Sequence, residues 1–280
     1  MSLLPSNSKA SVIISVYNRF DFLKLVLAGF ERQQESDFEI IIADDGSNAE
    51  FITQFNALKK KSNLRIKHIW QEDLGFRKNR ILNQAVIAAE SEYLIFIDGD
   101  CIPHPEFVSG HLQQAQQKYC LSGRRVDLSN RLTKQLTPEF IQDGNLESGS
   151  FFLQMIVDYL RLKLFHLMNG FYTQNQLLLR YFNRKERGLL GANFSLYKSD
   201  LLAINGFDER YTQPTFGEDT DVEYRLRLAG ITIKPILNIA VLYHCYHKLL
   251  PRPDESRLLF EQVQKEKLFF TLHGINKPPN

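Results

Sequence analysis

The 280-residue chain has few cysteines, no long hydrophobic run and no excess of one charge, and each of these features excludes a class of protein. Cys101, Cys120 and Cys245 are widely spaced and odd in number, which disfavours a disulfide framework and suits a reducing compartment. No apolar run reaches the roughly 18 residues of a transmembrane helix, and the first residues lack the pattern of a signal peptide. The 34 basic and 32 acidic side chains leave a formal net charge of +2, so no nucleic-acid partner is expected. These features predict a cytoplasmic globular protein.

The first hundred residues alternate between short apolar runs and longer segments with helical spacing. The apolar runs are Ser11–Val16, Phe38–Ala43, Leu64–Trp70 and Tyr93–Ile97, and the helical segments between them are Phe20–Gln34, Ala49–Lys61 and Phe76–Ala89. This alternation predicts an α/β fold, in which a parallel sheet is covered by helices on both faces. Because ligands of such sheets bind beyond the carboxyl ends of the strands, the residues that follow each run are the first candidates for a site.

Beyond Val126 the pattern changes. Residues 133–185 have helical spacing, and later runs predict three more strands and two helices. The later strands are expected at Leu189–Tyr197, Ile231–Ile236 and Ala240–Tyr243, and the helices at Asp219–Ala229 and Asp254–Phe269. We therefore divide the chain into an α/β half (1–126), a helical insertion (127–188) and a second half (189–280).

Acidic residues follow two of the predicted strands. Asp44 and Asp45 open the segment DDGS, and Asp98, Gly99 and Asp100 follow the run YLIFI. Carboxylate oxygens suit Mg²⁺ or Mn²⁺, which keep open positions for substrate phosphates. DDGS is equally typical of a turn that caps a helix. The DGD segment is harder to explain in that way, because two carboxylates this close repel each other unless a positive group joins them.

Two further motifs lie in the second half. Glu218 and Asp219 open a predicted helix, where carboxylates are also favoured by the helix dipole alone. His244 and His247 lie three residues apart, so in an extended segment they would point to opposite faces and only one need bind a metal. Zinc bound through these histidines and Cys245 is disfavoured, because no second Cys/His pair has zinc-finger spacing.

Taken in order, these motifs resemble the family 2 glycosyltransferases of the GT-A fold, and more closely the bacterial branch that has a galactosyltransferase-like C-terminal region. The matching segments extend over about residues 11 to 250 and are SVIISVYNR, ADDGS, DLGFR, FIDGDCIPHPEFV, GANFSLYKSDLLAINGFDERY, GEDTD and YHCYH. The resemblance implies a Rossmann-like, mostly parallel sheet flanked by helices. It also implies metal-dependent, inverting transfer of a hexose from a UDP-sugar to a hydroxyl of a glycan or lipid-linked acceptor, in surface polysaccharide biosynthesis.

The resemblance also assigns roles on the donor side. Val16, Tyr17 and Asn18 would lie against the nucleotide, and Asp44 would accept a hydrogen bond from uracil. Arg77 would lie near the nucleotide or its phosphates. The remaining nucleotide-side residues are Asp98 and Gly99.

The metal and acceptor sides are assigned in the same way. Asp98 and Asp100 match the family's D-x-D pair, with Asp100 as the direct ligand of Mn²⁺ or Mg²⁺. His244 or His247 would be the C-terminal metal ligand, with His244 slightly favoured. Asp219 would be the general base, and Glu218 would orient the acceptor hydroxyl.

The chain departs from the family pattern at two places. Many members have Arg-Asn where Leu82-Asn83 stands, so one basic contact is absent or moved. An aromatic residue, often Trp, commonly precedes Gly-Glu-Asp, and here Phe216 is the residue that could substitute for it. The sugar and the acceptor therefore cannot be carried over from the family.

Two other functions remain as alternatives. A nucleotidyltransferase would usually have a Gly-rich segment with a downstream Lys after the first strand, and Ser11–Val16 is not followed by one. A catalytically inactive nucleotide-sugar-binding or scaffold protein would keep the fold without turnover. The intact set of Asp98, Asp100, Asp219 and His244 argues against such loss.

The segment 151–190 combines apolar residues with a local positive charge. It has six basic residues and two acidic ones, a local balance of +4; the basic residues are Arg161, Lys163, Arg180, Arg184, Lys185 and Arg187. Such a segment can lie as a peripheral element on the inner face of the cytoplasmic membrane. Alternatively, its apolar face packs on the core and its basic face is solvated.

Overall fold

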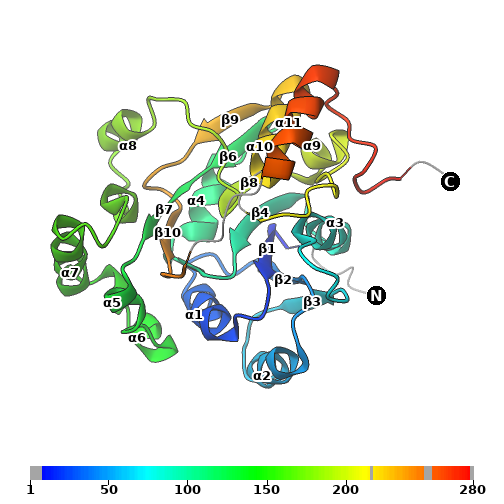
Figure 1. The fold of residues 1–280 in the computed structure, drawn as a ribbon. Coiled ribbons are helices and arrows are strands. Elements are labelled where there is room, and N and C mark those ends of the chain that lie inside the picture. Colours follow the sequence, from blue (N-terminus) through cyan, green and yellow to red (C-terminus); the bar gives the residue numbers. More distant parts are fainter. Residues whose placement is uncertain (1–7, 215–216, 249–253, 278–280) are drawn as a thin grey trace, which may run out of the picture.

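A seven-stranded sheet forms the centre of the computed structural model, which describes residues 8–214, 217–248 and 254–277 (Figure 1). In spatial order its strands are β3 (Ile66–Trp70), β2 (Phe38–Asp44), β1 (Ala10–Val16), β4 (Tyr93–Asp98), β8 (Asn193–Tyr197), β6 (Tyr119–Ser122) and β9 (Thr232–Pro235). All neighbours run parallel except β8, which is antiparallel to both β4 and β6. The predicted α/β fold with a mostly parallel sheet is confirmed.

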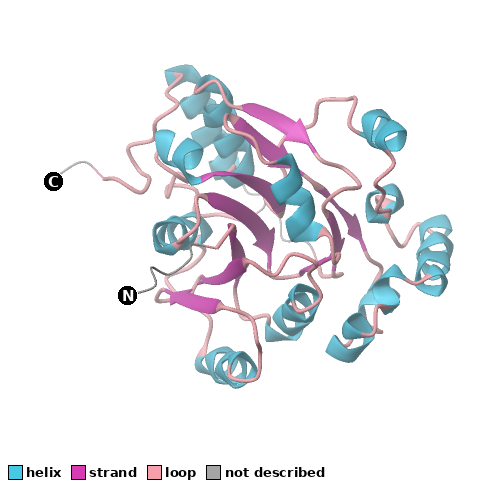
Figure 2. Cartoon of the chain, turned by 180° about the vertical axis from the view of Figure 1, so that it is seen from behind, coloured by secondary structure: helices cyan, strands magenta, loops and turns pink. Residues whose placement is uncertain are grey.

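Helices cover both faces of this sheet, as the apolar runs predict (Figure 2). Val12 and Ile14 pack on one face with α1 (Phe20–Phe30), α2 (Ala49–Lys59) and α4 (Phe107–Gln114). Ile13 points to the other face, which is covered by α3 (Lys78–Ala88), α9 (Lys198–Ala203) and α10 (Glu218–Leu228). The strands are therefore apolar on both sides, which is why they read as continuous apolar runs in the sequence.

A second, three-stranded sheet lies beside the first. It consists of β5 (Cys101–Pro103), β10 (Val241–His244) and β7 (Arg124–Asp127), with β10 in the middle. In its register, His244 is paired with Cys101 on one side and with Asp127 on the other. β5, β6, β7 and α4 could not be predicted from the sequence, because elements of three to eight residues carry too little periodicity to be recognised.

The predicted helical insertion consists of short helices. They are α5 (Asn130–Thr133), α6 (Pro138–Gln142), the 3₁₀ helix η1 (Asn145–Glu147), α7 (Gly149–Leu160), the 3₁₀ helix η2 (Leu167–Gly170) and α8 (Gln176–Phe182). Ser129, Thr137, Ser148 and Asn175 each accept a backbone N–H at the start of one of the α-helices, which fixes where these helices begin. The last described helix, α11 (Asp254–Glu266), packs beside α10.

The division of the chain at residues 126 and 188 stays a prediction. Strands from residues 1–126 and from residues 189–280 pair in the same seven-stranded sheet. No helix in the described part of the chain is both long and apolar enough to cross a membrane.

His111 of α4 is buried between β6 and β8 and predicts a pH-dependent stability. Its Nδ1 lies 2.8 Å from Ser195 Oγ and its Nε2 lies 3.1 Å from Asn193 Oδ1. Burial lowers the pKa of His111 from 6.5 to about 3, so below pH 6.5 the unfolded chain binds a proton that the folded chain excludes. The free energy of unfolding should therefore fall by about 2 kcal/mol between about pH 6.5 and pH 5, at about 1.36 kcal/mol per pKa unit.

Urea unfolding of the wild type and His111→Gln at these two pH values measures the effect. The variant keeps an amide at this position but has no titrating group, so its pH dependence should be shallower. An identical pH dependence in both proteins would contradict the prediction.

Candidate active site

A cavity of about 420 Å³ lies at the carboxyl ends of β1 and β4. Among the residues that line it are Val16, Tyr17, Asp98, Gly99 and Asp100, all singled out from the sequence. Gly99 is needed here, because a Cβ at this position would lie 2.8 Å from Val16 Cγ1 and 2.9 Å from the Ser15 carbonyl oxygen. The volume falls in the range of small-molecule binding sites.

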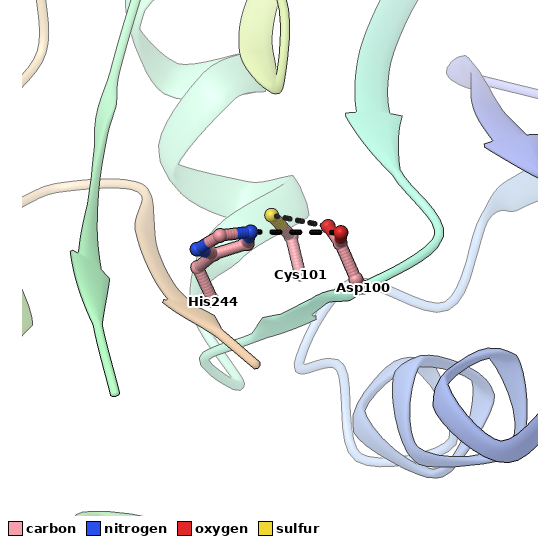
Figure 3. Close-up of side chains that lie close together, drawn as sticks. All are labelled: Asp100, Cys101 and His244. Atoms are coloured by element: carbon pink, nitrogen blue, oxygen red, sulfur yellow. Dashed lines mark hydrogen bonds and ion pairs between the residues drawn. The ribbon is translucent and has the colours of Figure 1, made fainter. Parts of the chain in front are cut away.

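One wall of the cavity contains a cluster of metal-ligand side chains. Asp100 Oδ2 lies 3.5 Å from His244 Nε2 and 3.1 Å from His247 Nε2. The two histidine nitrogens are 3.2 Å apart. Figure 3 shows Asp100, from the turn before β5, beside Cys101 of β5 and His244 of β10. The three nitrogen and oxygen atoms thus point to one small volume beside the cavity.

This geometry corrects the expectation that His244 and His247 point to opposite faces. β10 ends at His244, and the chain leaves the extended conformation there, so strand alternation does not apply to His247. Both rings approach the same carboxylate. The sequence pattern alone could not reveal where the strand ends.

Two neighbours of this cluster were not recognised from the sequence. Asp127, at the end of β7, places its Oδ1 2.9 Å from His244 Nδ1, so it holds the face of the ring turned away from Asp100. Cys101 Sγ lies 3.4 Å from Asp100 Oδ1. Burial raises the pKa of the Cys101 thiol well above its usual value, so the group stays protonated and acts as a weak donor to Asp100.

The charges in the cluster stabilise one another. Burial works against ionisation of Asp100, but hydrogen bonds to His244 and His247 outweigh it and lower the pKa of this carboxyl. Burial would lower the pKa of His244, yet Asp100 and Asp127 raise it. The pKa of His247 is raised chiefly by its hydrogen bond to Asp100. The side chains are thus held together by mutual attraction.

Lys78, at the start of α3, connects the end of β4 with the start of α10. Its Nζ lies 2.9 Å from Asp98 Oδ1 and 2.9 Å from Glu218 Oε1. Ser15 Oγ donates a further hydrogen bond to Asp98 Oδ1. Burial opposes the charge on Lys78, but the two carboxylates outweigh it and raise the pKa of the ammonium group. Lys78 therefore supplies the positive charge between Asp98 and Glu218, whereas Asp100 is paired with His244 and His247.

Glu218 and Asp219 begin α10 and differ in their surroundings. Glu218 Oε1 accepts from Lys78, whereas its Oε2 is buried with no hydrogen-bond partner among the described residues. Burial raises the pKa of Glu218 despite the nearby Lys78. Asp219 Oδ2 accepts the backbone N–H of Gly191 at 3.1 Å, and its Oδ1 accepts that of Thr220 at 2.8 Å. The backbone therefore fixes the orientation of the Asp219 carboxylate.

The structure does not bring Asp44 to the cavity, contrary to the expected contact with uracil. Asp44 is fully buried at the end of β2, where its Oδ2 lies 2.9 Å from His68 Nε2 and its Oδ1 accepts the Ser47 N–H. Because side chains alternate along a strand, the next residue points the other way, and Asp45 is the acid that lines the cavity.

Asn18 and Arg77 do not themselves line the cavity, although the residues on either side of each one do, so their nearness to a nucleotide stays a prediction. Asn18 has a positive φ of 53° and accepts the Asn48 N–H, so it shapes the loop after β1. Arg77 donates through its side chain to the Glu72 carbonyl oxygen and through its backbone N–H to Asp45 Oδ2. Phe216, the expected aromatic residue before Gly217, lies outside the described residues.

Comparisons with solved structures show that this arrangement is the GT-A fold. S. aureus TarS residues 1–349 in complex with UDP superimposes with a TM-score of 0.59 at 16% identity, over 92% of this chain and 65% of that one. GalNAc-T7 with UDP, GalNAc and Mn²⁺ superimposes with a TM-score of 0.59 at 13% identity, over 93% of this chain and 50% of that one. A Pyrobaculum calidifontis mannosyltransferase with GDP-Man and Mn²⁺ superimposes with a TM-score of 0.55 at 14% identity, over 87% of this chain and 59% of that one.

Residues 11–186 match the model of glycosyl transferase family 2, and residues 178–248 match the model described as the N-terminal domain of galactosyltransferase. The chain belongs to glycosyl transferase family 2, as its motifs predict. Chondroitin synthase of Escherichia coli is 29% identical over 250 residues, which are 84% of this chain and 34% of that protein. Validoxylamine A glucosyltransferase of Streptomyces hygroscopicus subsp. jinggangensis is 28% identical over 233 residues, which are 79% of this chain and 52% of that protein. The chain thus spans about a third to a half of the length of these relatives.

Proposed function

We propose that this protein transfers a hexose from a UDP-sugar to a hydroxyl of a glycan or lipid-linked acceptor, with inversion at the anomeric carbon, in surface polysaccharide biosynthesis. The observation that carries the proposal is the convergence of Asp100, His244 and His247 on one wall of the cavity that Lys78 and Asp98 also line. A nucleoside diphosphate needs both features, a cation site and a polar cavity.

The residues present fit a divalent cation. One carboxylate oxygen and two imidazole nitrogens are ligands that Mn²⁺ accepts, and Asp127 orients His244 from behind, as outer partners of metal-bound histidines commonly do. Asp98 completes the D-x-D pair from the end of β4. A divalent cation bound here would neutralise negative charge on the diphosphate leaving group.

The donor nucleotide has suitable contacts at the other end of the cavity. Tyr17 is 49% exposed there, and its hydroxyl donates to Asp73 Oδ2 at 2.9 Å, so its ring is held in place as a surface for a base. Asp45 replaces Asp44 as the acidic group available to the nucleotide. Arg19 lines the same cavity and supplies a cation near the phosphates.

The acceptor hydroxyl is handled by the start of α10. Asp219 takes the proton as the hydroxyl oxygen attacks the anomeric carbon; the new C–O bond forms while the bond to the diphosphate breaks. The Gly191 and Thr220 N–H groups hold this carboxylate in one orientation. Glu218 Oε2, which has no partner among the described residues, accepts a hydrogen bond from a sugar hydroxyl. Transfer from the face opposite the leaving group inverts the anomeric centre.

We also propose that the protein works in the cytoplasm. Cys101, Cys120 and Cys245 are free and buried, which suits a reducing compartment. The predicted membrane contact of residues 151–190 is independent of the transfer chemistry.

Calorimetric titration with UDP and with several UDP-sugars, each with Mn²⁺ and with EDTA, tests the proposal. We expect UDP to bind only with the metal, and one UDP-sugar to bind best. Asp100→Ala should weaken UDP binding in the presence of Mn²⁺, whereas Asp254→Ala, which changes an exposed acid of α11, should bind UDP as the wild type does. The absence of UDP binding in both conditions would overturn the nucleotide assignment. Binding of a UDP-sugar without transfer to any acceptor would favour the inactive binding protein.

A further inference from the structure

The segment 151–190 exposes an unusual concentration of large apolar side chains. Of the 23 large apolar residues exposed in the described part of the chain, 11 lie in these 40 residues. Leu160 and Leu162 at the end of α7 are 73% and 79% exposed, and Leu177 of α8 is 74% exposed. Scattered exposed apolar residues are normal, but a concentration of this kind marks an interaction surface.

All six basic residues of this segment are exposed as well. Within the described part of the chain, none of them is within ion-pair distance of a carboxylate. The two acidic residues of the segment do not neutralise these six positive charges. Asp158 is buried and bonded to Ser129 and Arg131, so Glu186 is the one exposed acid of the segment. We call the exposed apolar and basic side chains of residues 151–190 the insertion surface.

Packing against the core does not account for these side chains. In α7 only Phe151, Met155 and Asp158 are buried, and in α8 no residue is buried. The alternative of an amphipathic helix with its apolar face on the core holds for α7, where Phe151 and Met155 are buried and Ile156 packs against them, but it leaves the exposed apolar side chains of α8 unexplained. Figures 1 and 2 place both helices along one side of the molecule, away from the two described ends of the chain.

We propose that the insertion surface binds an anionic lipid bilayer. Exposed Leu and aromatic side chains can enter the boundary between headgroups and acyl chains, while Lys and Arg beside them contact anionic headgroups. Arg184 lies over the ring of Tyr181, 4.4 Å from its centroid, so an apolar ring and a cation are presented together.

The charge of the insertion surface selects a bilayer over a second copy of the same chain. In a symmetric dimer the same surface would face itself, which would bring the cations of one copy against those of the other. An anionic bilayer supplies the opposite charge over the whole surface. This inference does not depend on the proposed transfer reaction.

Co-sedimentation with vesicles tests the inference. The probes are phosphatidylcholine vesicles with and without about a third of phosphatidylglycerol, at low and at high ionic strength. We expect binding only to the anionic vesicles, with a loss at high salt because surface charges are screened. Leu160→Asp with Leu162→Asp should reduce vesicle binding at least about tenfold, and Arg161→Glu with Lys163→Glu should do the same.

Matched controls separate this surface from general effects of charge. Leu258→Asp changes a leucine of α11 that is 59% exposed but lies outside the insertion surface. Lys60→Glu with Lys61→Glu reverses two exposed positive charges just after α2, as many as Arg161→Glu with Lys163→Glu reverses. Both controls should bind anionic vesicles as the wild type does. A cooperative urea unfolding transition in every variant shows that each one is folded, whether or not the protein binds UDP.

Three results would overturn the inference. They are no binding to anionic vesicles at low salt, an equal loss of binding in the control variants, and a stable wild-type dimer that Leu160→Asp with Leu162→Asp converts to a monomer. The last result would assign the surface to a second copy of this chain. None of these results depends on whether transfer activity is found.

Discussion

Replacing Asp219 by Asn should lower the turnover number by about 10²–10⁴-fold and leave UDP and metal binding unchanged. The amide has nearly the shape of the carboxylate, and its one oxygen can still accept either the Gly191 or the Thr220 N–H, while the other N–H loses its acceptor. It cannot take a proton from the acceptor hydroxyl. The loss should therefore appear in the turnover number and not in the affinity for the donor.

Steady-state kinetics with a UDP-release assay, together with calorimetry, measure the two quantities separately. Asp254→Asn is the matched control, because it removes the same charge from the first turn of α11, away from the cavity. Full turnover in Asp219→Asn would refute its assignment as the base. Glu218, the neighbouring acid, would then be tested by Glu218→Gln.

Replacing Lys78 by Met should lower both turnover and stability. The variant leaves Asp98 and Glu218 without the cation that now lies 2.9 Å from each. Removing one partner of a buried ion pair costs about 3 kcal/mol or more, because the remaining charge stays desolvated. The loss of a positioned charge at the reacting centre should reduce turnover about 100-fold.

Urea unfolding and steady-state kinetics of three variants separate these effects. Lys78→Arg keeps the charge and should retain most of the stability. Lys78→Met with Glu218→Gln removes one of the stranded carboxylates, so it should recover part of the stability lost in Lys78→Met but none of the turnover. Wild-type stability and turnover in Lys78→Met would contradict the role of Lys78 in the site.

Lys78 lies close to the departure from the family pattern at Leu82. The two residues are four apart on α3 and therefore share a face of the helix. Leu82 is buried among the apolar residues below, and Lys78 lies one turn closer to the cavity. Lys78 is thus a basic side chain one helical turn from the position where many family members have Arg.

The long, periodic elements of this protein could be predicted from the sequence. β1, β2, β4 and their helices are built from continuous apolar runs and helical spacing that depend on neighbouring residues alone. The acidic motifs could be predicted as well, because they follow those strands directly. Val16, Tyr17, Asp98, Gly99 and Asp100 accordingly line the cavity.

Side-chain direction at the ends of strands was less predictable. A shift of one residue at the end of β2 decides whether Asp44 or Asp45 faces the cavity, and the sequence contains both. In the same way, the end of β10 at His244 decides that His247 turns back to Asp100.

The sequence by itself determined the parallel α/β core, the family and the set of residue types that the site needs. Only the tertiary structure decided which of them meet. The small sheet of β5, β7 and β10 brings Asp100, Asp127 and His244 together from positions far apart in the chain, and Lys78 meets Glu218 across 140 residues. The physical reason is that strand pairing and side-chain contacts depend on long-range register, which local periodicity does not encode.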